Sequence, residues 1–160
     1  MTDSTPTPDE LLIAYRSGPD FLAAAIDGLD AEALRARPIP GKMSSLEVLC
    51  HIVDSDLMMC ERMKRTVGMD RPLIMGAETA AYPEPLHYHE RDLELDLRLL
   101  AVQREQMAAD LERLPTEAWE RTAVHSETGL VTLLDLLDHA VDHLESHTAS
   151  IAEKRAALGL

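Results

Sequence analysis

Seven large side chains between positions 93 and 114 constrain the fold of this chain most strongly. They follow one another in alternating steps of four and three residues: Leu93, Leu97, Leu100, Arg104, Met107, Leu111 and Leu114. Side chains at this spacing line one face of a helix, and a long seam of them is typical of helices that pack lengthwise in a bundle. We therefore predict a helix from about Glu90 to Leu114 that buries this face against other helices.

Arg104 is the charged member of this seam. It would either anchor an anionic substrate or pair with Asp54 inside the bundle. Alternatively, its apolar stem lies along the core while its guanidinium group reaches water, as long basic side chains commonly do. The sequence leaves these possibilities open.

Capping motifs mark the starts of three more helices. In each, a threonine or serine is followed three residues later by an acidic residue. The side chain of each residue can then accept a hydrogen bond from the backbone N–H group of the other. The three pairs are Thr7 with Glu10, Ser44 with Glu47, and Thr132 with Asp135. They predict helices from Thr7 to about Leu29, with a break or kink at Gly18-Pro19, from Ser44 to about Val67, and from Thr132 to about Leu158.

The connecting segments complete the predicted fold. The stretch from Gly68 to Glu90 is rich in proline, glycine and aromatic residues and is expected to form a long crossover loop, a kind of loop that is usually functional. We expect a short helical turn at Thr116 to Glu120 and then a loop through Gly129, and we find no strand pattern. The prediction is one all-α domain over residues 1–160, an up-down-type four-helix bundle with the long crossover loop between its second and third helices.

The composition excludes several classes of protein. Hydrophobic residues make up 46% of the chain, but no apolar run approaches the roughly 20 residues that span a bilayer, so we expect no membrane partner. The N-terminus has neither the basic stretch nor the apolar core of a secretory signal, which makes a cytoplasmic location the expectation. Cys50 and Cys60 lie about 15 Å apart on one predicted helix, too far for a disulfide.

The chain carries a formal net charge of -14, from 29 acidic and 15 basic residues. Such a surface repels a phosphate backbone, and no basic patch interrupts it. A nucleic-acid partner is therefore not expected.

Three histidines stand four residues apart in the last predicted helix: His139, His143 and His147. Side chains at this spacing lie one above the other, and neutral imidazole is the commonest metal ligand. His143 and His147 border the apolar stripe of the helix, whereas His139 faces away from it and is expected to face water. The pattern predicts a metal pair at His143 and His147, unless the histidines merely occupy a solvated helix face.

His51 is the only other histidine in a long helical pattern and is therefore the candidate third ligand. It lies in a polar strip with Glu47, Asp54, Ser55 and Arg62, between two apolar stripes of its helix. This strip is either solvated or the wall of a pocket. The second is possible because a helix that is apolar on both sides packs against two neighbouring helices. The periodicity does not decide between the two.

Two stretches resemble the DinB-like (DinB/YfiT) superfamily: GKMSSLEVLCHIVDSDLMMCERM and HSETGLVTLLDLLDHAVDHLESHTASI. The resemblance implies a four-helix bundle that holds a divalent metal at one end of its interior, with open positions for water or substrate. The ligands it implies are His51, His143 and His147, and His139 matches no ligand position. Met43 departs from the family pattern, because many members have tryptophan before the capping serine.

Other polar groups have two possible roles each. His125 occupies a family-like His-x-x-x-Gly position and either reaches the mouth of a pocket or makes a hydrogen bond within its loop. Glu47 and Asp54 lie four and three residues from His51, so they either orient its imidazole from outside the ligand shell or remain solvated carboxylates. Arg104 is a further candidate pocket residue, for the reasons given above.

An open three-histidine site suits Zn or Ni about equally, and such a metal lowers the pKa of a water or thiol near neutral pH. The resemblance favours an S-transferase type of enzyme that activates a low-molecular-weight thiol toward a small-molecule electrophile. One alternative is a metal-dependent hydrolase of an amide or ester. Another is a non-enzymatic metal-binding or ligand-binding bundle. We also expect a homodimer, formed through the apolar faces of the second helix.

Overall fold

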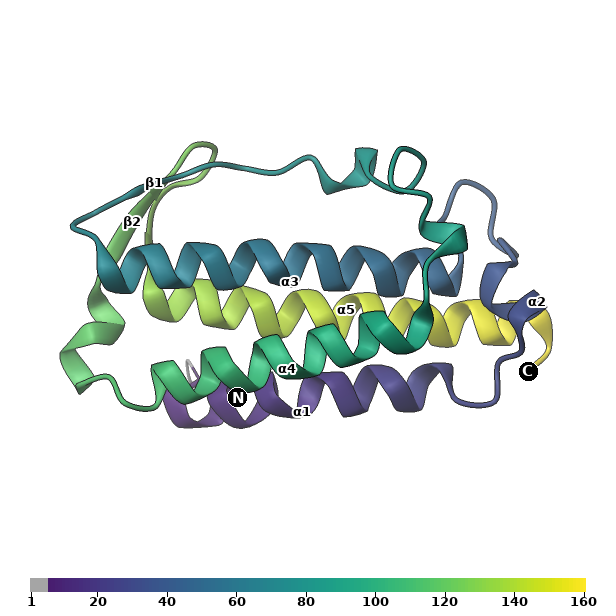
Figure 1. The fold of residues 1–160 in the computed structure, drawn as a ribbon, viewed down its shortest axis with the longest axis horizontal. Coiled ribbons are helices and arrows are strands. Elements are labelled where there is room, and N and C mark those ends of the chain that lie inside the picture. The colour runs from purple at the N-terminus through teal and green to yellow at the C-terminus, as the bar shows by residue number, and fades with distance from the viewer. Residues whose placement is uncertain (1–5) are drawn as a thin grey trace, which may run out of the picture.

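The computed structural model describes residues 6–160, and in it four long helices lie side by side (Figure 1). They are α1 (Pro8–Ile26), α3 (Ser45–Gly68), α4 (Leu93–Leu111) and α5 (Leu133–Leu158), and the short α2 (Ala31–Arg35) follows α1. Helices α1 and α5 run in one direction and α3 and α4 in the other, because the chain returns along the bundle between α3 and α4 (Figure 1). The predicted four-helix bundle is confirmed.

The three predicted capping boxes begin their helices. The side chains of Thr7, Ser44 and Thr132 accept hydrogen bonds from the backbone N–H groups three residues on, and the acidic side chains there bond back. The last helix ends at Leu158, as predicted, before Gly159 in the left-handed conformation. Local sequence thus sets these helix starts before any tertiary contact is considered.

Of the break or kink predicted at Gly18-Pro19, the break is wrong, because α1 continues through Pro19 to Ile26. A proline inside a helix leaves the carbonyl four residues earlier without its N–H donor. Here that carbonyl belongs to Tyr15, and Arg104 Nη1 donates to it at 3.0 Å. A side chain from α4 therefore replaces the missing backbone hydrogen bond.

Arg104, the charged member of the seam, is buried in the bundle and only 1% exposed. Its Nε and Nη2 donate to Asp56 Oδ1 at 2.9 and 2.6 Å, and Nη2 also donates to the Ala140 carbonyl at 2.9 Å. The predicted pairing with Asp54 is wrong, because Asp56 faces α4 at this level of the bundle. The guanidinium group does not reach water, because it is buried and bonded to Asp56 and to two backbone carbonyl groups.

A small three-stranded sheet closes one end of the bundle, where no strand was expected. It consists of β1 (Leu73–Ile74), β2 (Thr122–His125) and β3 (Gly129–Thr132), in the order β1-β2-β3. Strand β1 is parallel to β2, and β2 pairs with β3 in an antiparallel hairpin. The predicted loop through Gly129 is therefore wrong, because strands of two to four residues are too short to show an alternating pattern.

Three short helical turns lie in the connections. The predicted turn after α4 is confirmed as η3 (Thr116–Glu120). The segment 69–92 contains η1 (Thr79–Ala81) and η2 (Tyr88–Glu90) besides β1, and it passes along the outer side of α3 (Figure 1). This segment covers the face of α3 on which the site described below is built.

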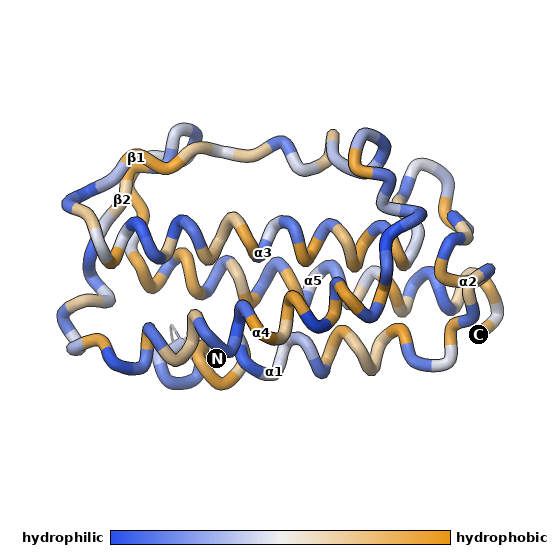
Figure 2. The backbone as a smooth tube through the Cα atoms, viewed as in Figure 1, coloured by the Kyte–Doolittle hydropathy of each residue, from blue (hydrophilic) through white to orange (hydrophobic). Residues whose placement is uncertain are grey.

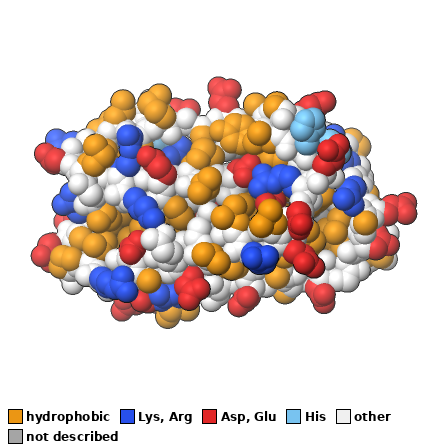
Figure 3. All heavy atoms as spheres, in the orientation of Figure 1, with side chains coloured by type: hydrophobic (Ala, Val, Ile, Leu, Met, Phe, Trp, Pro, Cys, Tyr) orange, Lys and Arg blue, Asp and Glu red, His pale blue; other side chains and the backbone are white. Residues whose placement is uncertain are grey.

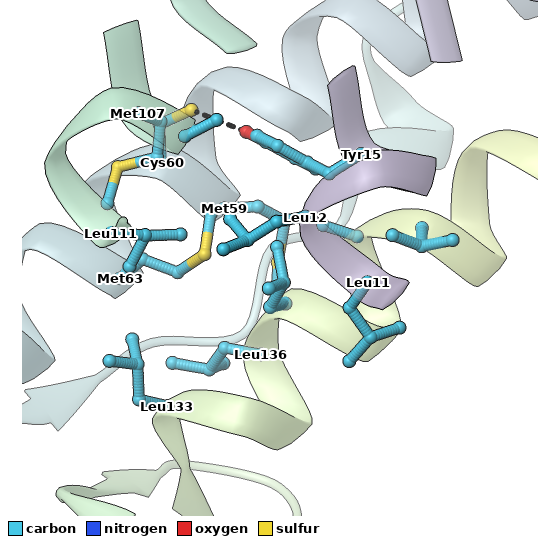
Figure 4. Close-up of a cluster of buried hydrophobic side chains, with 14 of the residues drawn as sticks. Leu11, Leu12, Tyr15, Met59, Cys60, Met63, Met107, Leu111, Leu133 and Leu136 are labelled. Carbon is cyan, nitrogen blue, oxygen red and sulfur yellow. Dashed lines mark hydrogen bonds between the residues drawn. The ribbon is translucent and has the colours of Figure 1, made fainter. Parts of the chain in front are cut away.

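Hydrophobic residues recur along each long helix, separated by polar ones (Figure 2). They form two buried clusters, one below the sheet and one toward α2. Figure 4 shows the first cluster, with Leu12 of α1 beside Met59 of α3. Among residues 6–160, no helix is long and apolar enough to cross a membrane.

Most of the two apolar stripes of α3 is buried inside the chain, with Leu57 54% exposed, so they offer little surface to the expected dimer. Cys50 and Cys60 on this helix are buried and free, as predicted. Exposed apolar side chains lie instead on the outer face of α4, at Leu95, Leu99 and Val102, which are 57%, 42% and 65% exposed. Elsewhere on the face shown in Figure 3, acidic, basic and hydrophobic side chains are interspersed.

Candidate metal centre

The structure brings together His51 of α3 with His143 and His147 of α5. One ring nitrogen from each lies within 4.8 Å of the other two. The Nε2 atoms of His51 and His143 are 3.2 Å apart, and the ring centroids of the three pairs are separated by 4.5 to 5.0 Å. These are the three histidines that the family resemblance implied as ligands.

Helix packing explains this arrangement. Helices α3 and α5 contact one another along the bundle and run in opposite directions (Figure 1). His143 and His147 lie one turn apart on α5, so both rings point toward α3. His51 meets them from the polar strip of α3, which is therefore the wall of a site and not a solvated face.

The environment keeps the three imidazoles neutral. Burial and, to a smaller extent, the neighbouring His147 lower the pKa of His51 to about 4. Burial and the other two imidazoles lower the pKa of His143 to about 3, and burial also lowers the pKa of His147. All three rings are therefore neutral near pH 7, which is the form that donates a lone pair to a metal.

The residues present fit a divalent transition metal. Three neutral imidazoles converge with no carboxylate hydrogen-bonded to them among residues 6–160. His51 Nδ1 is buried and has no hydrogen-bond partner within the same residues. Histidine-only nitrogen donors suit Zn, Ni, Cu or Fe better than Mg or Ca.

A pocket of about 430 Å³ lies beside the three histidines, with His143 in its wall. Four parts of the chain form it: α3, the segment 76–79, the turn between β2 and β3, and α5. Its lining residues are Ser55, Met58, Met59, Arg62, Gly76, Ala77, Thr79, His125, Glu127, Thr128, Val131, Asp135, Leu136, His139 and His143. A cavity of this size accepts a small organic molecule.

Glu47 and Asp54 do not orient His51 through a hydrogen bond, contrary to one of the roles considered for them. Glu47 accepts hydrogen bonds from Arg37 and from the Ser44 backbone. Asp54 accepts them from Tyr88 at 2.7 Å and from Arg91 at 2.9 Å. Neither is simply solvated, because each carboxylate is held by an arginine from another segment.

His125 and His139 both line the pocket. The Nδ1 atom of His125 accepts a hydrogen bond from the Glu127 backbone at 3.2 Å, so this residue combines the two roles considered for it. His139 is exposed, as predicted, and its ring centroid lies 6.0 Å from that of His143. Ser55 and Arg62 also line the pocket; the sequence placed them in the polar strip of His51 but did not single them out as site residues.

Comparisons with known proteins agree with this architecture. A sequence profile described as the DinB superfamily matches residues 14–151. The structure of YfiT from Bacillus subtilis superposes with a TM-score of 0.90 at 21% identity, covering 99% of this chain and 93% of that one. A DinB-like protein of the same organism superposes with a TM-score of 0.60 at 20% identity, covering 94% and 92%. A search of curated proteins finds no match.

Proposed function

The chain belongs to the DinB superfamily, and from this premise we propose that it is a metal-dependent hydrolase of a small-molecule ester or amide. The observation that supports the proposal is the convergence of three neutral imidazoles beside a pocket of about 430 Å³. YfiT, which shares the fold, is described as "a probable metal-dependent hydrolase with an unusual four-helix bundle topology".

In this proposal His51, His143 and His147 hold Zn²⁺ or Ni²⁺. A divalent metal supplies Lewis acidity, which polarises a carbonyl group and lowers the pKa of a water or a thiol. The pocket walls hold the substrate against this end of the cavity. His139 and His125 are the two further imidazoles on the wall, and we assign to them the uptake of the proton that the attacking water loses.

Elemental analysis of untagged protein tests the metal centre first. We expect about one Zn or Ni per chain in the wild type and none in the His143→Ala, His147→Ala double variant. Metal-loaded and chelator-treated protein are then compared on a panel of 4-nitrophenyl esters and 4-nitroanilides. Absence of metal in the wild type after incubation with Zn and Ni would contradict the proposal and leave a non-enzymatic ligand-binding bundle.

A second candidate is transfer of a low-molecular-weight thiol to an electrophile. The observation that favours it is the engagement of Glu47 and Asp54 with arginines, which leaves neither carboxylate as a general base. A thiol that ionises at the metal needs no such base for its attack. Thiol-dependent consumption of an aryl halide by the metal-loaded protein, with no ester or anilide hydrolysis, would select this candidate.

We also propose that the chain forms a homodimer. Leu95, Leu99 and Val102 are exposed and follow one another at steps of four and three residues on α4. This spacing suits the packing of one helix against a second copy of itself. Light scattering on the wild type and on Leu99→Glu tests the proposal, since the variant is expected to be monomeric; a monomeric wild type would contradict it.

A further inference from the structure

One face of α3 continues from the metal centre along the whole pocket. His51, Ser55, Met58 and Arg62 follow one another at steps of four, three and four residues, which places them on the same side of the helix. The last three of them line the pocket together with His143. Eleven residues of helix separate His51 from Arg62, a rise of about 16 Å. The wall thus has imidazoles at one end and a guanidinium group at the other.

Ser55 lines this pocket and carries an unpaired hydroxyl group. Its side chain is 9% exposed, and its Oγ is buried without a hydrogen-bond partner among residues 6–160. Buried hydroxyl groups in folded proteins are nearly always hydrogen-bonded, so an unpaired one beside a cavity indicates a missing partner. A polar atom of a bound molecule would satisfy it.

Arg62 supplies a cation that no acidic side chain neutralises. Its Nη2 donates to the Met75 carbonyl at 2.6 Å, and its Nη1 lies 3.4 Å from Met59 Sδ. No carboxylate of residues 6–160 forms an ion pair with it. A guanidinium group has five N–H donors, so several remain for an anion.

Two carboxylates also line the pocket, and neither forms an ion pair with Arg62. Asp135 accepts a hydrogen bond from the Thr132 backbone at 2.8 Å, as part of the cap of α5. The carboxylate of Glu127 lies against Gly76, so closely that a β-carbon there would displace it. Between the two polar ends, Met58, Met59, Val131 and Leu136 make the pocket wall apolar.

We propose that the substrate is a small carboxylate-bearing molecule with an apolar middle, an inference that rests on the proposed hydrolase function. Its carboxylate binds the free donors of Arg62, and a polar atom near its reacting group bonds to Ser55. The apolar middle lies on the methionines, which directs the reacting ester or amide toward the three histidines. Arg62 and Ser55 are thereby the residues that determine specificity.

Binding of two matched probes to the metal-loaded full chain tests this assignment without turnover. The probes are 4-phenylbutyrate and the neutral 4-phenylbutanamide, and isothermal titration calorimetry measures their dissociation constants. We expect the anion to bind about tenfold or more tightly than the amide, as a charge-assisted hydrogen bond provides. Arg62→Gln removes this preference and leaves the affinity for the amide unchanged, whereas Arg62→Lys, which keeps the charge, retains most of it.

Arg65→Gln is the matched control, because Arg65 lies on the same helix outside the pocket and pairs with Glu61. This variant keeps the preference for the anion. Equal affinity of the two probes, or no measurable binding of either, would overturn the inference. So would a preference that survives Arg62→Gln and disappears in His143→Ala, since the carboxylate would then bind at the metal.

The outcomes separate this inference from the proposed function. Hydrolysis of neutral esters without any preference for the anionic probe leaves the hydrolase proposal intact and overturns the assignment of the substrate. A preference that depends on Arg62, together with no hydrolysis of any ester or anilide, supports the anion site and contradicts the hydrolase.

Discussion

Gly18 of α1 lies directly against the guanidinium group of Arg104: a β-carbon at Gly18 would be 2.5 Å from Arg104 Nη1 and 3.0 Å from Leu144 Cδ1. Arg104 cannot retreat, because its nitrogens are bonded to Asp56 and to two carbonyl groups. In a helix interior, alanine is ordinarily about 1 kcal/mol more favourable than glycine. We expect Gly18→Ala instead to lower the free energy of unfolding by about 1–3 kcal/mol, as overpacking does.

Urea denaturation of Gly18→Ala and Gly68→Ala measures this difference. Gly68 is the last residue of α3, and a β-carbon there would meet no atom within 4 Å. We expect Gly68→Ala to be neutral or slightly stabilising. Equal stability changes in the two variants would contradict the close packing of Arg104 against α1.

Arg104 of α4 also bonds to the backbone of α1, so we expect substitutions in these two helices to have coupled effects on stability. Pro19 removes the donor for the Tyr15 carbonyl, and Arg104 Nη1 supplies a replacement at 3.0 Å. Pro19→Ala restores a backbone N–H donor for the Tyr15 carbonyl. In this background, losing the Arg104 hydrogen bond to that carbonyl through Arg104→Met should lower the free energy of unfolding less. We expect a coupling free energy of about 1 kcal/mol in a double-mutant cycle of the two changes, the usual size of one hydrogen bond. Additive effects on the urea midpoints would show that the bond contributes nothing.

The helices were predictable because their signals are local. The caps at Ser44 and Thr132 involve residues three positions apart, and the seam of α4 repeats within two turns. Sheet β1-β2-β3 was not predictable, since β1 and β2 join segments about 50 residues apart through two to four residues each. The partner of Arg104 was likewise hidden, because Asp54 and Asp56 differ only in which face of α3 they occupy.

For the site, the sequence indicated the ligands but not their surroundings. The position of His143 and His147 beside the apolar stripe of their helix selected them over His139, and the family resemblance supported His51 as the third ligand. The pocket depends on the segment 76–79 and on the hairpin that presents His125, and no periodicity places loops over a helix. Asp54 was a reasonable partner for His51 by spacing alone, yet Arg91 and Tyr88 bind it more directly.

His143 and His139 make a matched pair for metal binding, because they are neighbours on α5 and only His143 belongs to the three-histidine group. Loss of a group that merely supports a ligand typically weakens a metal site 10–100-fold, so loss of a ligand costs more. We expect His143→Ala to weaken Zn²⁺ binding by more than about 100-fold and His139→Ala to leave it nearly unchanged. Competition with a chromogenic chelator measures both affinities. Similar losses in the two variants would place the metal elsewhere on α5.

Metal binding should also stabilise the fold, because the three ligands converge only in the folded chain. A ligand at 100 times its dissociation constant stabilises the native state by about 2.7 kcal/mol. We expect Zn²⁺ to raise the melting temperature of the wild type and of His139→Ala, and not that of His143→Ala. An equal increase in all three proteins would indicate binding to surface carboxylates.

Glu47 makes the stability of the folded chain depend on pH through the cap of α3. Burial alone would raise the pKa of this carboxyl group, but hydrogen bonds from Arg37 and the Ser44 backbone outweigh it and hold the pKa below its ordinary value of 4.5. A carboxylate whose pKa is lower in the folded chain adds stability above the unfolded pKa and loses it as the pH falls through the folded one. Glu47 therefore stabilises the protein above the ordinary pKa of 4.5, and this contribution is lost as the pH falls through the lower pKa of the folded state.

Glu47→Gln tests this dependence, because glutamine keeps the shape of the cap and removes the charge. We expect the variant to be about 1 kcal/mol less stable than the wild type at pH 7, and this difference to shrink as the pH falls below the ordinary carboxyl pKa of 4.5. Glu10→Gln is the matched control, since Glu10 holds the equivalent position of the α1 cap with an exposed side chain and no arginine partner. Urea unfolding at several pH values between 3 and 7 measures both. A difference for Glu47→Gln that is independent of pH would mean that the cap acts through its shape and not through its charge.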